Sequence, residues 1–319
     1  MKSISQLTDF YYKTLYPTLQ ELEKDRQAIK NRVVNIGIAY TLIVLLILFL
    51  LYDHFDFELF IYIGFFYVAI GAWIYKYLIS DYKSNFKQKV IAPLIKEIDE
   101  NLTYIPNRHL PSSNFERSKL FTTRPDRVSG NDYVRGKIDN INIAFSDFHA
   151  EKRYENSKGE ESWETIFMGL LIVSDFHKKF HGETVVLPDS AQTLFGDLVG
   201  AWFQAHNFSR DELVKMDNPD FEKEFVVYST DQIEARYILS PTLMQKLLNY
   251  KRKTKHPLHI SFIGGKIYMA IEYNDDMFEA SVFHSLLKYK IAMEYIGTLH
   301  LVISIVKELK LNQKLWSKV

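Results

Sequence analysis

The stretch that decides the fold is Val33–Tyr52, VVNIGIAYTLIVLLILFLLY, which contains no charged side chain. A helix of this length spans about 30 Å, the thickness of the hydrocarbon core of a bilayer. A second uncharged run covers Leu59–Tyr75, and it extends to Ile79 if the Lys76 side chain snorkels toward the lipid headgroups. The sequence therefore predicts a two-helix transmembrane hairpin with spans at about 33–52 and 57–79.

Three alternatives to a membrane hairpin fit these two runs less well. A cleavable signal peptide would begin closer to Met1, and a second span would not follow it at once. A buried helix pair of a soluble protein would rarely keep so long a run free of charge. A re-entrant pair stays open as an alternative, although each run is long enough to cross.

Lysine and arginine flank the two spans on one side only. They precede the first span and follow the second at Lys24, Arg26, Lys30, Arg32, Lys76, Lys83, Lys87 and Lys89. The turn Asp53–Glu58 has neither residue type. The positive-inside rule then places both termini and the soluble domain in the cytoplasm. If the protein is bacterial, we expect it to be a multi-pass protein of the inner membrane.

Helical stripes of apolar residues continue both spans into the cytoplasmic side. Before the first span the stripe comprises Leu15, Leu19, Leu22, Ile29 and Val33, interrupted by Arg26; after the second it comprises Phe86, Val90, Leu94, Ile98 and Leu102. The two stripes either pack on each other as a stalk or lie on the membrane or on the soluble domain. Pro17 is expected to mark a start or kink in the first helix, and Pro93 is expected to bend the second.

The remaining composition excludes several classes of function. Lys and Arg together number 39, as do Asp and Glu, so no global basic charge points to a nucleic-acid partner. The chain has no cysteine, which excludes disulfides, thiolate metal sites and cysteine nucleophiles. We expect no cofactor and no bound metal.

Residues beyond the hairpin show strand and turn patterns. Strands are expected at 134–138, 141–145, 163–173, 184–187, 225–229, 259–263 and 266–272, with hairpin turns at Asp139-Asn140, Asn156–Gly159 and Gly264-Gly265. The continuous apolar run Ile166–Val173 is typical of a central strand covered on both faces.

Helical patterns are interspersed with these strands. Helices are expected at 190–206, from Ser240-Pro241 to about Lys253, and over a long C-terminal segment from about Val282 to Leu315. The predicted class is α+β, with a cytoplasmic antiparallel sheet covered by helices. The predicted domains are a membrane hairpin with flanking helices (1–103), a linker rich in proline and turn formers (104–114) and a soluble domain (115–319).

Several strings in the soluble part are similar to those of a known family. They are Phe115–Phe121, Pro125-Asp126, Gly130, Asp132, Gly136–Ile138, Phe145-Ser146, His149–Glu151, Phe167–Leu170, Asp175-Phe176, Thr184–Asp189, Phe221–Lys223, Phe225–Tyr228 and Asp231–Pro241. In this order they resemble an uncharacterised bacterial membrane-protein family, the domain of unknown function thirty-one thirty-seven, over about residues 80–282. The resemblance implies a bacterial membrane protein with two N-terminal spans. It supplies no activity, so no catalytic residue is carried over.

The densest polar cluster of the sequence is Asp231, Glu234 and Arg236. We interpret it first as a buried or half-buried ion pair that holds two elements together, and second as a ligand site. His177 and His181 have the spacing of two ligands on one helix face, but no HExxH motif surrounds them. His256 and His259 give equally little support for a metal.

A basic group formed by Lys251, Arg252, Lys253 and Lys255 ends a predicted helix. Cations there complement the helix dipole, which accounts for them without a ligand. Contact with anionic lipid is the second interpretation, because each basic residue near such a surface contributes about 1 kcal/mol.

No phosphate loop, nucleophile elbow or paired cysteine motif occurs in the sequence. The leading hypothesis is therefore a membrane-anchored binding or scaffold module with a membrane or cytoplasmic protein partner. The rival is a membrane-bound enzyme, of hydrolase type, whose site is assembled from residues that are distant in the sequence.

Overall fold

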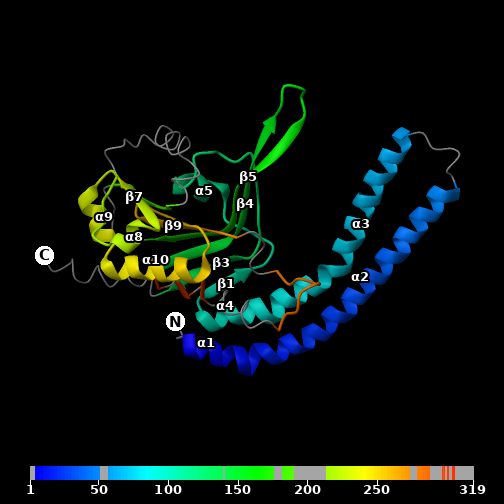
Figure 1. Ribbon diagram of the computed structural model, residues 1–319. Coiled ribbons are helices and arrows are strands. Elements are labelled where there is room, and N and C mark those ends of the chain that lie inside the picture. The colour runs from blue at the N-terminus through cyan, green and yellow to red at the C-terminus, as the bar shows by residue number, and fades with distance from the viewer. Residues whose placement is uncertain are drawn as a thin grey trace. The chain divides into compact units, whose positions relative to one another are not determined.

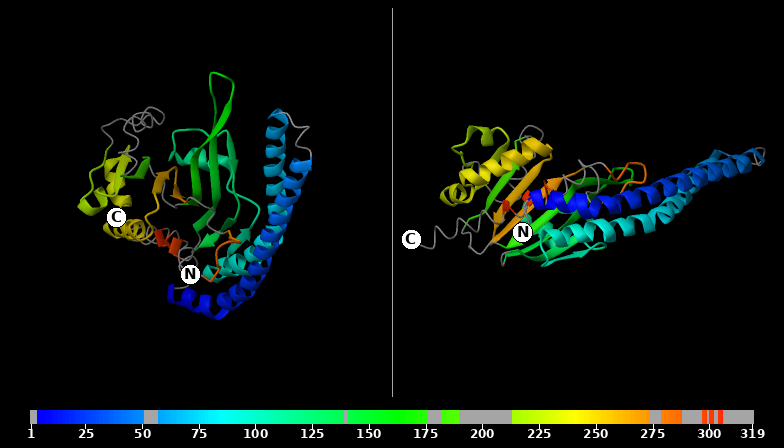
Figure 2. Two further views of the ribbon diagram at one scale, coloured as in Figure 1. Left: turned by 45° about the vertical axis from the view of Figure 1, so that its right-hand side comes forward. Right: turned by 90° about the horizontal axis from the view of Figure 1, so that it is seen from below.

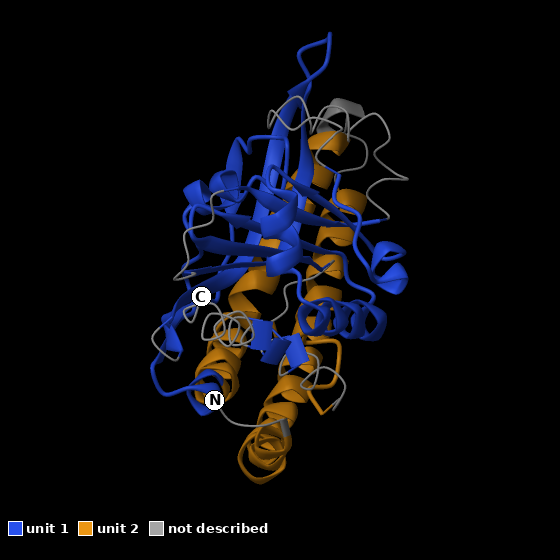
Figure 3. Cartoon of the chain, turned by 90° about the vertical axis from the view of Figure 1, so that its left-hand side faces the viewer, with its two compact units in different colours: residues 1–4, 95–277, 292–319 blue, residues 5–94, 278–291 orange. Residues whose placement is uncertain are grey.

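A computed structural model describes residues 4–50, 57–138, 141–175, 182–189, 213–273 and 279–287, together with 297, 298, 300, 301, 304 and 305. The chain divides into two compact units, shown in different colours in Figure 3. One comprises residues 5–94 and 278–291 and is called the helical unit below. The other comprises residues 1–4, 95–277 and 292–319 and is called the sheet unit.

Two long helices dominate the helical unit and run side by side in both views of Figure 2. In chain order the elements are α1 (Ile4–Phe10), the π-helical turn η1 (Tyr11–Leu15), α2 (Tyr16–Leu50), α3 (Phe57–Phe86), a second π-helical turn η3 (Lys87–Ile91) and α4 (Ala92–Ile98). Both long helical stretches are long and apolar enough to cross a membrane. Their most apolar windows are almost wholly unburied among the described residues.

Each π-helical turn ends two residues before a proline. The N–H of Tyr16 donates to the carbonyl of Tyr11, one residue before Pro17, and the N–H of Ala92 donates to that of Lys87, one residue before Pro93. Proline has no N–H, and its ring clashes with the carbonyl four residues earlier. A wider turn moves that carbonyl aside. The two prolines therefore widen continuous helices, whereas the sequence suggested a start or a bend.

The two apolar stripes predicted beside the spans are largely buried. Leu15, Leu19 and Leu22 on the first side, and Phe86 and Val90 on the second, are each at most 5% exposed. α2 packs against α3 and η3, as expected for the stalk interpretation. Leu102, expected to continue the second stripe, instead begins a strand.

The described residues of the sheet unit contain one antiparallel nine-stranded sheet (Figure 1). Its strands are β1 (Leu102–Ile105), β2 (Arg127–Ser129), β3 (Tyr133–Ile138), β4 (Ile141–Glu155), β5 (Glu161–Asp175), β6 (Thr184–Pro188), β7 (Phe225–Ser229), β8 (Leu258–Ile263) and β9 (Lys266–Glu272). They lie in the order β1-β3-β4-β5-β9-β8-β6-β7, and β2 pairs with β4. The antiparallel sheet confirms the predicted α+β class.

The predicted hairpins follow from turn chemistry. Gly264 and Gly265 join β8 and β9 with φ values of 57° and 73°, the left-handed pair that a two-residue type I′ turn needs. Asn156 accepts backbone N–H groups of Lys158 and Glu160 and so closes the turn between β4 and β5. The expected turn at residues 139–140 lies outside the described residues, although Ile138 and Ile141 pair across it.

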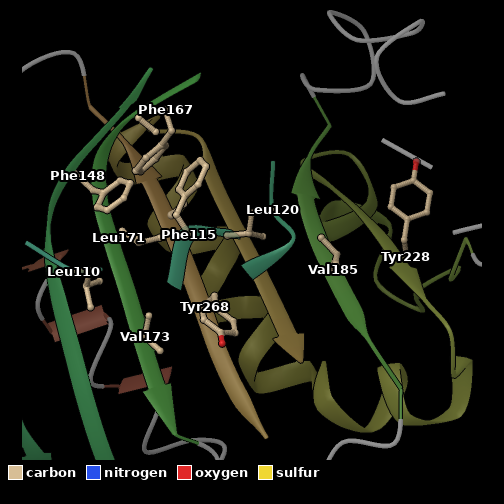
Figure 4. Close-up of a cluster of buried hydrophobic side chains, with 12 residues drawn as sticks. Leu110, Phe115, Leu120, Phe148, Phe167, Leu171, Val173, Val185, Tyr228 and Tyr268 are labelled. Atoms are coloured by element: carbon tan, nitrogen blue, oxygen red, sulfur yellow. The ribbon is translucent and has the colours of Figure 1, made fainter. Parts of the chain in front are cut away.

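Short helices complete the described part of the sheet unit: α5 (Ser112–Ser118), α8 (Pro219–Glu222), α9 (Gln232–Ile238) and α10 (Pro241–Thr254). Ser240 caps α10 by accepting the N–H of Leu243 at 3.2 Å, as the sequence predicts. In Figure 4 the side chains of Phe115, Leu120 and Phe148 gather between the α5 segment and one face of the sheet.

Two of the expected element boundaries differ in the structure, and one expected helix stays untested. The linker at 104–114 begins inside β1 and ends inside α5, because Tyr104 and Ile105 pair with β3. Residues 281–287 form bends and turns, so no helix begins at Val282. The helix expected at 190–206 lies outside the described residues.

Candidate functional site

A groove of about 490 Å³ lies on one face of the sheet. Its floor follows from strand register, since Arg135 of β3 pairs with Ala144 of β4, and Ala144 pairs with Val173 of β5. Directly paired residues project to the same face. The lining residues are Thr103, Leu110, Pro111, Asn114, Tyr133, Arg135, Gly136, Lys137, Asn142, Ile143, Ala144, Val173, Asp175 and Lys266.

The α5 segment makes one wall of this groove. Leu110 is buried and joins Phe115 and Phe148 in the hydrophobic cluster of Figure 4. Its backbone N–H donates to the Ser146 hydroxyl at 2.9 Å, which fixes the start of the segment on β4. Leu110, Pro111 and Asn114 thus border the part of the sheet face that α5 does not cover.

Gly136 allows β1 to approach β3 closely at the floor of the groove. A Cβ at this position would lie 2.3 Å from the carbonyl oxygen of Asn101 and 3.0 Å from the Cα of Leu102. Backbone atoms cannot move aside as the end of a side chain can. Glycine at this position therefore lets β1 extend the floor of the groove beyond β3.

The carboxylate of the groove is already engaged. Asp175 accepts from the Lys266 ammonium at 2.7 Å and from the Asn142 amide at 2.7 Å. Burial raises the pKa of Tyr268, which pairs with Val173 across β5 and β9 on the same sheet face. Its hydroxyl therefore stays neutral and adds no negative charge.

Arg135 and Lys137 are the cations without such a partner. Both are exposed on β3, two residues apart and so on one face of the strand. Among the described residues neither forms an ion pair. With Asp175 neutralised by Lys266, the groove combines an apolar floor at Ala144 and Val173 with a net positive rim.

In the part of the chain that the structure describes, the side chains of the predicted polar cluster bond to backbone groups. Asp231 is the N-cap of α9 and accepts the N–H groups of Ile233 and Glu234 at 3.0 and 2.9 Å. The Glu234 carboxylate accepts the N–H of Gly182 at 2.9 Å. Arg236 donates to the carbonyls of Gln232 and Lys215. The three side chains thus bond mainly to backbone and connect α9 with neighbouring segments.

The predicted basic group at the end of α10 is only partly available for lipid. Arg252 lies 3.2 Å from Asp220 and 4.0 Å from Glu224. Lys251 donates to the carbonyl of His256 at 3.4 Å. Lys253 and Lys255 are exposed and, within the described part of the chain, have no ion-pair partner.

The histidines considered as metal ligands do not converge. His259 is buried and its Nε2 lies 2.7 Å from Glu272, while the His256 ring packs on Tyr273. His177 and His181 lie outside the described residues. In the described ranges no three His, Asp or Glu side chains are grouped so as to hold a metal.

A second, smaller cavity of about 280 Å³ lies beside residues 147–149 of β4. Its lining is Ser129, Gly130, Asn131, Asp147, Phe148, His149, Met168 and Gly169. His149 lies 2.9 Å from the Thr165 hydroxyl and 3.9 Å from Glu151. The Arg127 guanidinium donates to both carboxylate oxygens of Glu151. The polar side chains near this cavity therefore bind one another.

Sequence reasoning missed the groove, although one signal was present. Arg135 and Lys137 alternate with Val134, Gly136 and Ile138 in a predicted strand, which indicates one wet face that carries cations. The pattern did not show which strands lie beside it. Lys266 and Asp175 meet only through the pairing of β5 with β9.

Comparison with known families and structures gave two findings. Residues 165–311 match the model of a family described as Protein of unknown function (DUF3137), the family that the sequence strings resemble. The strings before residue 165 lie outside that match. A comparison with curated proteins found no match.

Among solved structures, the crystal structure of the mycobacterial trehalose monomycolate transport factor A, TtfA, is similar with a TM-score of 0.34 and 9% sequence identity. The similarity covers 64% of this chain and 86% of that one.

Proposed function

We propose that this chain, whose residues 165–311 carry the DUF3137 match, is a membrane-anchored binding module. The spans at about 33–52 and 57–79 cross a bacterial inner membrane, and both termini are cytoplasmic. The groove between β1, β3, β4, β5 and the α5 segment holds an amphiphile with a phosphate or carboxylate group. Binding is non-covalent.

Exposure of the apolar helices supports the anchor. Side chains such as Leu42, Leu46 and Phe65 are 61%, 56% and 69% exposed, and they belong to continuous apolar runs. Contiguous apolar surface of this extent marks contact with a membrane or partner. Lysine and arginine residues flank the two runs on one side and are absent from the turn Asp53–Glu58, and this asymmetry supports the proposed orientation.

The single observation that carries the binding function is the pair of cations Arg135 and Lys137, which form no ion pair within the described ranges and line the groove together with the apolar residues Ala144 and Val173. A ligand with an anionic head would pair with them, and its apolar part would cover Ala144 and Val173. Arginine suits this role because its planar guanidinium binds phosphate or carboxylate with two donors.

The size of the groove favours a small amphiphile over a protein partner. Small-molecule sites have volumes of roughly 300–1,000 Å³, and the groove has about 490 Å³. A standard protein interface instead covers about 800 Å² on each partner. The rival hydrolase would need an available acid or base in the groove, and Asp175 is held by Lys266 and Asn142.

The test measures binding to the full-length protein in nanodiscs of zwitterionic lipid. Calorimetry with octyl phosphate, octyltrimethylammonium and inorganic phosphate, each corrected with empty nanodiscs, distinguishes an amphiphile from a free anion. We expect octyl phosphate to bind most tightly. Changing both Arg135 and Lys137 to Glu should weaken it at least about tenfold, which corresponds to about 1.4 kcal/mol.

The matched control changes Lys253 and Lys255 to Glu, because it alters the same total charge away from the groove. Equal binding by the two double variants would contradict the groove as the site. If inorganic phosphate binds as tightly as octyl phosphate, the ligand is a free anion and the proposal of an amphiphile is rejected. An acidic protein that copurifies with the parent but not with the Arg135 and Lys137 variant would replace the amphiphile with a protein partner.

A further inference from the structure

The segment that follows the sheet returns to the long helices within the helical unit. Residues 279–287, coloured orange in Figure 1, contact both α2 and α3. Glu279 pairs with Lys83, and the carbonyl of Val282 accepts from Arg26 Nη1 at 2.5 Å. The N–H of Leu286 donates to Glu23 at 3.0 Å. We call residues 279–287 the strap.

The order of these contacts gives the strap a direction. It begins at Lys83 and reaches Tyr75, on which the Phe283 ring stacks with 6.3 Å between centroids and an interplanar angle of 9°. Lys83 and Tyr75 are eight positions apart on α3, or about 12 Å along the helix. The strap then returns to Glu23 on α2. Phe283 is therefore the tip of the strap, and it lies beside Tyr75 at the C-terminal end of the second apolar run.

Hydrogen bonds within the strap build this tip as a tight turn. The Ser281 hydroxyl accepts the N–H groups of Phe283 and His284 at 3.2 and 3.3 Å, and it lies 3.0 Å from His284 Nδ1. Val282 and Ala280 are buried, whereas Phe283 is 51% exposed. The strap thus fixes its backbone on the helices and directs one large apolar side chain outward.

The surroundings of Phe283 identify what would cover it. A single exposed apolar side chain is ordinary on a soluble protein. Here, however, Tyr75 belongs to the last turns of the apolar run, beside Trp73 and Tyr77, which stack on each other and are 67% and 71% exposed. Aromatic rings of this kind gather at the boundary between lipid headgroups and acyl chains.

We propose that the strap is a membrane-interface anchor, in which Phe283 inserts beside Tyr75 at the headgroup boundary of the cytoplasmic leaflet. This inference rests on the proposed spans. The exposed Phe283 side chain would contact lipid at the membrane interface, beside the exposed apolar surface of α3. The chain that leaves β9 is then held at the bilayer surface by the helices and by lipid together.

The test uses the absence of cysteine in the chain. Single cysteines replace Phe283, Leu46 or Tyr12 and carry a small environment-sensitive fluorophore in the full-length protein, reconstituted in liposomes. Lipids with a nitroxide near the headgroup or near the end of the acyl chain quench the fluorophore by depth. Leu46 reports on the first span, and Tyr12, 53% exposed and about 30 Å of helix before Val33, reports on water.

We expect the fluorophore at 283 to be quenched at least twofold more by the shallow nitroxide than by the deep one. The fluorophore at 46 should show the reverse, and that at 12 should be quenched by neither. If position 283 behaves like position 12 while 46 reports the deep nitroxide, the interfacial anchor is refuted and the spans remain. If the fluorophore at position 46 is not quenched by the deep nitroxide, the proposed spans are refuted, and with them the anchor that rests on them.

Discussion

The guanidinium of Arg26 binds the carboxylate of Glu23 with two hydrogen bonds, Nε to Oε2 at 2.9 Å and Nη2 to Oε1 at 2.7 Å. Both residues are 7% exposed, and each also binds the backbone of the strap. Arg26, the charged residue that interrupts the apolar stripe on α2, is therefore paired with Glu23. It also binds the strap at Val282, 256 positions away along the chain. Because the pair is bidentate and charge-assisted, its hydrogen bonds are stronger than those between neutral groups.

Arg26→Gln should release the strap. The change removes the bidentate pair and the guanidinium bond to Val282, and it leaves the Glu23 carboxylate buried without its cation, at a cost of about 2 kcal/mol. Hydrogen exchange of peptides covering 279–287, measured on the protein in nanodiscs, should accelerate by about tenfold or more. Lys13→Gln is the control, since the Lys13–Asp9 pair is exposed and should contribute nothing measurable. Unchanged exchange in the Arg26 variant would show that the pair does not hold the strap.

Acid should release the strap through Glu23. Burial by itself raises the pKa of the Glu23 carboxyl, but hydrogen bonds from Arg26 and from the N–H of Leu286 outweigh burial and hold the pKa below its ordinary value. The stabilisation is therefore complete above the unfolded pKa of about 4.3 and is lost as the pH falls through the lower folded value.

The measurement is the protection factor of the Leu286 amide against pH, which corrects for the intrinsic rate of exchange. Protection should be constant above about pH 5 and fall below about pH 4. Glu23→Gln should lower protection and remove the pH dependence. A parent profile that matches the Glu23→Gln profile would exclude this carboxyl as the titrating group.

The proposed topology predicts a labelling pattern in intact cells. Single cysteines at Ser3 and Ser317 should be shielded from an impermeant thiol reagent, because both termini are proposed to be cytoplasmic. A cysteine at His54, in the turn between the spans, should react. The parent chain lacks cysteine and gives no background. Labelling at 317 before permeabilisation would reverse the orientation.

Polar side chains join the two apolar helices. The Tyr40 hydroxyl donates to the Tyr67 carbonyl at 3.0 Å, the Tyr67 hydroxyl lies 2.8 Å from the Thr41 hydroxyl, and the Tyr40 and Tyr67 rings stack at 5.1 Å. Such bonds between membrane helices contribute about 0.6 kcal/mol on average.

Tyr67→Phe removes the bond to Thr41 and keeps the ring stack, so it should lower the unfolding free energy of the hairpin in detergent titration by about 0.6 kcal/mol. Tyr62→Phe is the matched control, because Tyr62 is 61% exposed and has no hydrogen-bond partner among the described residues. Equal losses in the two variants would show that the bond between the helices contributes nothing.

Local patterns in the sequence predicted most elements because their causes are local. The uncharged runs predicted α2 and α3, the turn at Gly264-Gly265 predicted the hairpin of β8 and β9, and Ser240-Pro241 predicted the start of α10. Leu102 shows where a local pattern failed. Its four-residue spacing fits the apolar stripe, but Asp99 caps the turn before it by accepting the N–H of Asn101, and the pairing of Leu102 with Gly136 then makes it a strand.

The sequence by itself determined which segments are apolar enough to cross a bilayer, the alternation of the strands and the turns that join neighbouring ones, because these depend on residues close in the chain. Only the tertiary structure decided what distant residues do together. The order of the strands brings Arg135, Asp175 and Lys266 around one groove. The return of residues 279–287 to the helices pairs Arg26 with Val282. Such contacts depend on how whole elements bury their apolar faces, which no local spacing encodes.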